Sequence, residues 1–330
     1  MERVSEKGES ERSAFKVRAI WIRIRVKRVW AAGAKAITVR KLLAFFLITL
    51  ALFSPGRRGN SRGAGSAQNP PSTQVSSIIS QAAWVSIPGV VDGLTTYALF
   101  WKPEKPAGRA VIMLWGSWNL GVQDMLTNPG ASTLIQKFID SGYTVLAVDP
   151  RGASGHGSLY QSLFDIGTDE VFDVISGAFW LKAESAPGLL FLAGVSHGGS
   201  LALRAAEEFP DYGIRVHGVL AFGPITDYQA WMDWACARQL RRCSFLLNWN
   251  AEQRFQGSPL HFVSKRLGPV FLVHGTLDSI VPIEQSRAWL KKDPDATLLE
   301  QPIDHVGLLN DTSIKKGLLW MNRIGNKKRR

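Results

Sequence analysis

Residues 189–199 read Leu-Leu-Phe-Leu-Ala-Gly-Val-Ser-His-Gly-Gly, an apolar run that ends in the pattern G-x-S-x-G. The following residues, Ser-Leu-Ala-Leu-Arg-Ala-Ala-Glu-Glu, are typical of a helix, so the stretch predicts a strand, a sharp turn and a helix. Such a turn exposes the Ser196 hydroxyl, and Gly194 and Gly198 lack the Cβ atoms that would collide across it. Ser196 is therefore a candidate nucleophile if a neighbouring base deprotonates it. The alternative is a glycine-rich turn with a solvated serine.

Short apolar segments alternate with helical segments on both sides of this stretch. Strands are expected at residues 84–87, 94–101, 110–115, 143–148, 189–195, 216–222, 269–274 and 296–301. Helices are expected at residues 132–141, 169–184, 197–209, 283–292 and 312–323. This alternation predicts an α/β fold, a mostly parallel sheet covered on both faces, with ligands at the carboxyl ends of the strands. Residues 224–262 interrupt the alternation and are expected to form a small cap over those ends.

The chain has 330 residues and a formal net charge of +12, but its basic residues are concentrated at the two ends. Residues 1–63 carry 15 Lys or Arg against 4 Asp or Glu, and residues 323–330 add 5 more basic side chains and no acid. The remainder carries a small excess of acid. This distribution argues against a nucleic-acid-binding surface on the globular part.

Residues 42–53 form an uncharged apolar run of twelve residues preceded by Arg40 and Lys41. A helix of this length spans about 18 Å, too short for the roughly 30 Å hydrocarbon core of a bilayer. Basic, apolar and then small residues are the layout of a secretory signal, although three arginines beyond the run fit it poorly. We expect residues 1–67 to be a basic region with a signal peptide or membrane anchor, which exports the following domain across the cytoplasmic membrane.

The remaining chain then divides by composition. Residues 68–83 are expected to be a linker, residues 84–323 the catalytic domain with its cap at about 224–262, and residues 324–330 a basic tail. The two cysteines, Cys236 and Cys243, are seven positions apart, a spacing that suits neither a redox pair nor a zinc site. In an oxidising compartment they could pair. On one helix, however, they would lie about 10 Å apart, beyond the reach of a disulfide, so buried free thiols are the expectation.

A nucleophilic serine needs a base and a residue that orients the base. Asp278 follows the apolar strand at 269–274, and His305 follows the strand at 296–301. The order Ser196, Asp278, His305 is that of the α/β-hydrolase fold, and it places all three side chains at one edge of the sheet. His305 would take the serine proton during attack on a carbonyl, and Asp278 would hold the imidazole through Nδ1–H.

Other histidines and acids offer weaker alternatives. His274 lies at the end of a buried strand and is expected to be structural. Asp304 adjoins His305, and a sequence neighbour rarely reaches the Nδ1 of the next residue. His156 and His217 are expected to have no acid at a strand end, and His261 is expected to pack within the cap or contact substrate.

Three motifs together resemble the catalytic domain of the prolyl oligopeptidase family. Residues 148–157, Val-Asp-Pro-Arg-Gly-Ala-Ser-Gly-His-Gly, look like its D-x-R-G loop, and residues 194–199 look like its G-x-S-x-G-G turn. Residues 274–286, His-Gly-Thr-Leu-Asp-Ser-Ile-Val-Pro-Ile-Glu-Gln-Ser, are similar to its acid loop. The resemblance covers residues 84–322 and implies an α/β-hydrolase fold, with catalysis by Ser196, Asp278 and His305.

The sequence departs from that family in two respects. The peptidases carry a β-propeller, for which we expect no room here, and the segment opposite the nucleophile reads Trp115-Gly-Ser-Trp118 instead of H-G-G or Y-x-G. We expect the backbone N–H groups of His197 and Ser117 to form the oxyanion hole. Candidate pocket residues are Trp115, Trp118, Trp231 and Trp234.

The leading hypothesis is an exported serine hydrolase that cleaves a small peptide or an ester and needs no metal or cofactor. The acid loop and the Arg-Gly loop favour a peptidase by resemblance, and the absence of a propeller favours a carboxylesterase. The non-enzymatic alternative is a membrane-tethered binding protein that has kept the fold.

Overall fold

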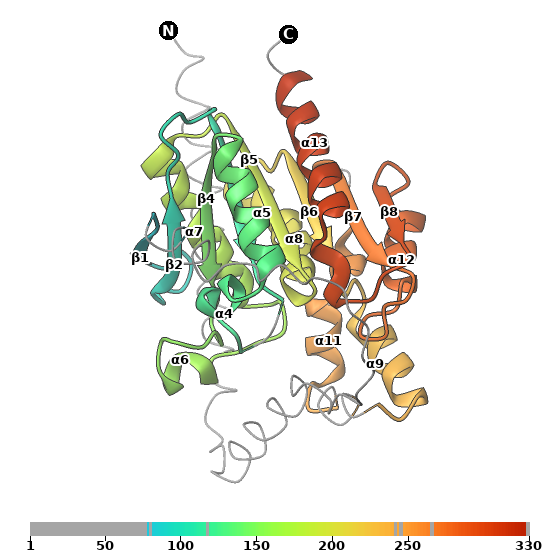
Figure 1. Cartoon of the computed structure of the whole chain (residues 1–330). Helices are drawn as coiled ribbons and strands as arrows, with labels where there is room; N and C mark the ends of the chain where they lie inside the picture. Colours follow the sequence, from blue (N-terminus) through green and yellow to red (C-terminus); the bar gives the residue numbers. More distant parts are fainter. Residues whose placement is uncertain are drawn as a thin grey trace, which may run out of the picture. The chain divides into compact units, whose positions relative to one another are not determined.

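The computed structural model describes residue 78 and residues 81–116, 119–240, 243, 247–264 and 267–327. Its centre is an eight-stranded sheet with the order β1-β2-β4-β3-β5-β6-β7-β8 (Figure 1). The strands are β1 (Ala83–Ile87), β2 (Thr96–Trp101), β3 (Arg109–Leu114), β4 (Tyr143–Asp149), β5 (Leu189–Val195), β6 (Gly218–Phe222), β7 (Val270–Gly275) and β8 (Thr297–Gln301). β2 is antiparallel to both of its neighbours, β1 and β4. The other six strands, β3 to β8, are all parallel to one another.

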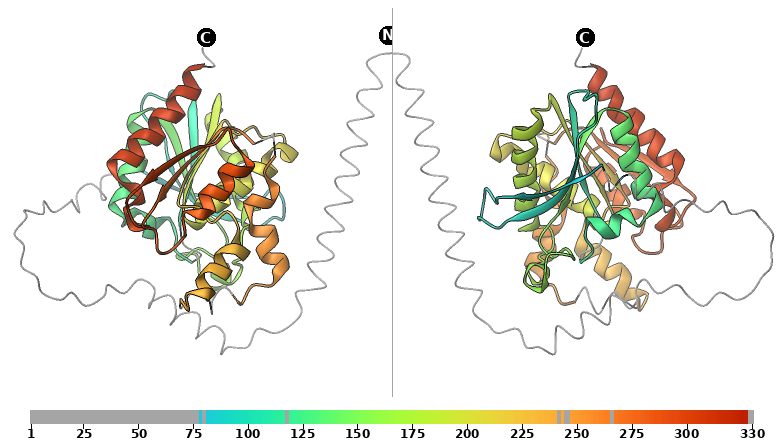
Figure 2. Two further views of the ribbon diagram at one scale, coloured as in Figure 1. Left: turned by 90° about the vertical axis from the view of Figure 1, so that its right-hand side faces the viewer. Right: turned by 60° about the vertical axis from the view of Figure 1, so that its left-hand side comes forward.

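Helices cover both faces of this sheet, as Figure 2 shows. One face packs against α7 (Glu170–Ser185), α8 (His197–Glu208) and α12 (Glu284–Lys292), and the other against α4 (Val122–Leu126), α5 (Pro129–Asp140) and α13 (Asp311–Lys327). All residues of β3, β4, β5, β6 and β7 are buried, which explains why their sequences are mostly apolar. The structure therefore has the α/β architecture that the sequence predicts.

Two short helices, α4 and α6 (Ser158–Ser162), are absent from the prediction. They follow β3 and β4, so they mark the side of the molecule where the parallel strands end. The cap helices α9 (Tyr228–Ala237) and α11 (Ala251–Gly257) lie beyond the sheet on this same side (Figures 1 and 2). The cap packs in an apolar cluster that includes Tyr228, Trp231 and Trp249 and also Ile166 and Val281 from outside the cap.

The expected domain ends need two corrections. Ile78, placed in the predicted linker, is fully buried in the core, and its carbonyl accepts a hydrogen bond from the Trp101 indole at 2.9 Å. α13 continues to Lys327, so residues 324–327 of the predicted tail are helical. There Gly325 lies close to the guanidinium of Arg109, which also donates to Asn326 at 2.8 Å.

The expectation of free thiols is wrong, because Cys236 and Cys243 form a disulfide with Cα atoms 4.8 Å apart. The prediction assumed one continuous helix. Instead, α9 ends at Ala237, and Gln239 adopts a left-handed conformation with φ 52°. This turn brings the chain back, so the two cysteines meet.

The expected signal or anchor at residues 1–67 lies outside the described residues. Among the helices of the described part of the chain, none is long and apolar enough to cross a membrane.

Candidate active site

Ser196 occupies the turn between β5 and α8 with φ 53° and ψ −123°. A residue other than glycine rarely adopts a positive φ, and such strained positions cluster at functional sites. The turn is held by the Ser196 N–H, which donates to the carbonyl of Phe222 at 2.7 Å. The neighbouring strand β6 therefore holds Ser196 in its strained backbone conformation.

Glycines allow three chain segments to meet around this serine. A Cβ on Gly194 would collide with the carbonyl of Gly198, and one on Gly198 would collide with the carbonyls of Leu114 and Trp115. A Cβ on Gly116 would lie 2.6 Å from the Val195 carbonyl oxygen and 2.9 Å from the Ser196 Cβ. The segment after β3 therefore packs directly against Ser196, the candidate nucleophile, where an oxyanion loop is expected.

Asp278 lies in the loop after β7 and is bound on both carboxylate oxygens. Its Oδ1 accepts hydrogen bonds from the N–H groups of Ile280 and Val281, each at 2.8 Å, and its Oδ2 lies 2.6 Å from His305 Nδ1. His274 Nε2 lies 3.5 Å from the same Oδ2. Burial raises the pKa of Asp278, but hydrogen bonds from His274 and His305 outweigh it and hold the pKa below its ordinary value. Asp278 is therefore ionised at neutral pH.

His305 follows β8 and its imidazole is held in one orientation by Asp278. Because an ionised carboxylate only accepts hydrogen bonds, Nδ1 of His305 carries the proton and Nε2 can act as a base. A Cβ on Gly223 would lie 3.3 Å from the His305 Cε1, and Gly223 directly follows Phe222, whose carbonyl binds Ser196. The end of β6 thus brings Ser196 and His305 to the same place.

The alternatives to this pair have structural partners. His274 is fully buried, with Nδ1 2.7 Å from Ser286 Oγ and Nε2 2.9 Å from the Val281 carbonyl. Asp304 is exposed and accepts the Gly307 N–H of its own loop. His305 is therefore paired with Asp278, and not with its sequence neighbour.

The prediction that His156 has no acid at a strand end is wrong. Its Nε2 lies 2.7 Å from Asp149, the last residue of β4, and its ring stacks on Tyr97 at 4.1 Å. The intervening loop turns back through Gly152 and Gly155, which have φ values of 97° and 91°. Burial raises the pKa of Asp149, whose Oδ1 also accepts the Val122 N–H at 2.6 Å.

Two other histidines pack within the structure. His217 Nδ1 accepts the Leu190 N–H at 3.0 Å. His261 stacks on Phe255 in the cap at 4.5 Å. These contacts give both rings a structural role.

The tryptophans predicted to line a pocket have different environments. Trp231 is 2% exposed in the cap core, and its indole N–H donates to the Ile280 carbonyl at 2.8 Å. It therefore connects the cap to the acid loop. Trp234 is half-buried with the Arg238 guanidinium 4.8 Å from its ring, and Trp115 is half-buried against the core. Ser117 and Trp118 lie outside the described residues.

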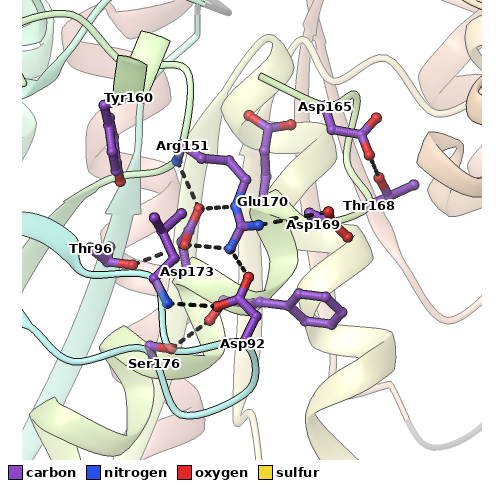
Figure 3. Close-up of polar contacts among 12 residues, drawn as sticks. Asp92, Thr96, Arg151, Tyr160, Asp165, Thr168, Asp169, Glu170, Asp173 and Ser176 are labelled. Atoms are coloured by element: carbon purple, nitrogen blue, oxygen red, sulfur yellow. Dashed lines mark hydrogen bonds and ion pairs between the residues drawn. The ribbon is translucent and has the colours of Figure 1, made fainter. Parts of the chain in front are cut away.

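Sequence reasoning from the residues missed an ionic cluster around Arg151, which Figure 3 shows. Its guanidinium contacts Asp173 at 2.9 Å, Asp92 at 2.7 Å and Asp169 at 3.7 Å. Burial lowers the pKa of Arg151, but the carboxylates of Asp173 and Asp92 outweigh it and raise the pKa above its ordinary value. The cluster joins the loop after β4 to α7 and to the β1–β2 connection.

The sheet order, the strained serine after β5 and the Asp278–His305 pair after β7 and β8 define an α/β-hydrolase. The model of the peptidase S9, or prolyl oligopeptidase, family matches residues 129–293, half of the chain. The chain belongs to this family.

The chain is also similar to three known proteins at low sequence identity. It is 23% identical over 212 residues to a protein of Mycobacterium tuberculosis named "probable carboxylic ester hydrolase LipM", covering 58% of this chain and 46% of that one. A puromycin hydrolase structure has a TM-score of 0.59 at 20% identity, covering 72% of this chain and 38% of that one. The Pyrococcus furiosus esterase Pf2001 has a TM-score of 0.57 at 19% identity, covering 83% and 97%. The chain thus spans less than half the length of the first two relatives.

Proposed function

We propose that this protein is a serine hydrolase that cleaves a small peptide or ester through an acyl-enzyme at Ser196. The observation that carries the proposal is the 2.6 Å contact between His305 Nδ1 and Asp278 Oδ2 at the sheet edge where Ser196 sits in its strained turn. Membership of the prolyl oligopeptidase family supports the same chemistry.

In the proposed mechanism, the Ser196 hydroxyl attacks the substrate carbonyl while His305 Nε2 takes its proton. Asp278 stabilises the resulting imidazolium through Nδ1–H. The backbone N–H of His197 donates to the oxyanion, because the helix does not use the N–H groups of its first turn. His305 then gives its proton to the leaving group, whose bond to the carbonyl carbon breaks. Water, deprotonated by His305, releases the acyl group in a second cycle.

The leaving group is either an amine or an alcohol. The acid loop and the Arg-Gly loop support a peptidase, as does the likeness to a puromycin hydrolase. A specific observation favours the second candidate, a carboxylesterase: the likeness to the esterase Pf2001 covers 97% of that chain. The relative of Mycobacterium tuberculosis also carries an ester hydrolase name.

Kinetics on matched substrates would separate these candidates. We would measure kcat/KM of the full chain for p-nitrophenyl acyl esters and for peptide p-nitroanilides, with Ser196→Ala as the blank. Turnover of anilides supports a peptidase, and turnover of esters alone supports an esterase. Hydrolysis of neither, or equal hydrolysis by Ser196→Ala, would overturn the proposal in favour of a binding protein.

We also propose that the catalytic domain acts outside the cytoplasmic membrane, with association to the membrane through the N-terminus. The basic and apolar order of residues 1–67 supports export. The disulfide between Cys236 and Cys243 supports an oxidising compartment. A fusion of residues 1–67 to a phosphatase that is active only outside the cytoplasm tests this, and an inactive but intact fusion would contradict it.

A further inference from the structure

A buried polar network lies directly behind the nucleophile. The His197 side chain has Nδ1 2.6 Å from the Tyr228 hydroxyl and Nε2 3.1 Å from each Glu170 carboxylate oxygen. Glu170 is 1% exposed, His197 3% and Tyr228 fully buried. The three side chains come from the first residues of α7, α8 and α9, elements that are distant in sequence.

Such a network is costly to bury, since ionisable groups lose their hydration. Burial raises the pKa of Glu170, which is offset in part by His197 and by the Gly167 N–H that donates to it at 2.8 Å. Burial also raises the pKa of Tyr228, so its hydroxyl stays protonated and available as a donor. Figure 3 shows Glu170 beside Asp169 of the Arg151 cluster, which anchors this end of α7.

The network holds the side chain of His197, the residue whose backbone N–H is the proposed oxyanion donor. His197 is the first residue of α8, so its side chain and the N–H proposed as the oxyanion donor belong to one residue. Tyr228 is the first residue of the cap helix α9. Ser200 adds a second link, because its hydroxyl contacts the Ser196 carbonyl and accepts the Ile225 N–H at 2.8 Å at the entrance to the cap.

We propose that Glu170 and Tyr228 are positioning residues that fix the oxyanion-donor amide of His197 through its side chain and couple it to the cap. They do not touch substrate. If either contact is lost, the His197 N–H is still present as a donor but is no longer held in position against the oxyanion. This inference rests on the proposed function.

The test replaces the carbonyl oxygen of the substrate, which the His197 N–H is proposed to bind, with sulfur. Sulfur is a weak hydrogen-bond acceptor, so a thionoester, with C=S in place of C=O, gains little from an oxyanion hole. The ratio of kcat/KM for a p-nitrophenyl ester to kcat/KM for its thionoester therefore reports oxyanion stabilisation. A purely structural role changes both substrates alike and leaves the ratio unchanged.

We would measure this ratio for Tyr228→Phe and Glu170→Gln, two near-isosteric variants. The ratio is expected to fall by about tenfold in each, less than the loss of a whole donor would cause. Tyr143→Phe is the matched control, because that buried tyrosine donates to Asn322 at 3.0 Å from the opposite end of β4. Its ratio should stay within about twofold of wild type.

The outcomes separate the two proposals. Wild-type ratios in both folded variants, verified by unfolding temperature, would overturn the positioning role while the hydrolase function stands. If only one variant folds, that variant alone decides. A wild-type protein that hydrolyses neither the ester nor peptide substrates would overturn the proposed function, and the positioning role with it.

Discussion

His305 Nδ1 lies 2.6 Å from Asp278 Oδ2, and the same carboxylate is gripped by two backbone N–H groups of its own loop. The Asp278 carboxylate is therefore held in position by its own loop, and it in turn orients the His305 imidazole. We predict that Asp278→Asn lowers kcat by about 10³-fold or more, because a neutral amide neither holds the Nδ1–H of His305 as the carboxylate does nor stabilises the imidazolium. Asp304→Asn, which alters the exposed acid beside His305, should leave kcat nearly unchanged. Equal losses in the two variants would contradict the assignment.

Asp278 should also make stability depend on pH. Its folded pKa lies below its ordinary value, so its contribution is present above the unfolded pKa of about 4 and is lost as pH falls towards the folded pKa. We predict that the wild type loses stability relative to Asp278→Asn as pH drops below about 4. Urea unfolding of both proteins from pH 7 downwards measures this, and parallel curves would be inconsistent with a lowered pKa.

Gly198 should not tolerate a side chain. Its Cβ would collide with the carbonyls of Leu114 and Trp115, which the backbone cannot easily move. Gly198→Ala should cost about 1–3 kcal/mol of unfolding free energy and reduce kcat/KM about 100-fold through displacement of Ser196. Gly188→Ala is the matched control, since its nearest contact is 3.5 Å away. A Gly198→Ala enzyme with full activity would show that the turn is less constrained than the structure indicates.

The ion pair between Arg151 and Asp173 should contribute to the stability of the fold because both side chains are buried. The Arg151 side chain is 6% exposed and that of Asp173 1% exposed. Arg151→Met should cost about 3–5 kcal/mol of unfolding free energy, since it leaves the buried Asp173 carboxylate without its cationic partner. Arg287→Met removes an exposed pair with Glu300 and should leave the unfolding temperature nearly unchanged. Similar temperature shifts in the two variants would refute the distinction.

Much of the fold could be predicted because its strands are short, apolar and buried on both sides. Every expected strand appears in the sheet, displaced by at most two residues at its start or end. The helices α4 and α6 were missed because five residues show no clear periodicity. The disulfide was missed because no glycine or proline marks the end of α9 before Cys243.

The site was predictable only where residues follow strands of one sheet edge. Ser196, Asp278 and His305 could be placed together because parallel strands end on the same side. Asp149 and His156 were not paired in advance, because a loop that doubles back has no periodic signal. The Glu170–His197–Tyr228 network was also missed, since its members come from three helix starts that only the tertiary structure brings together.

The central claim, that Ser196 is the nucleophile, is tested most directly by covalent labelling. A fluorophosphonate transfers its phosphonyl group to an activated serine hydroxyl, and peptide mass spectrometry locates the adduct. We predict one adduct, on Ser196, that is lost in Ser196→Ala and strongly slowed in His305→Gln. Labelling that persists in Ser196→Ala, or an adduct on a different serine, would contradict the claim.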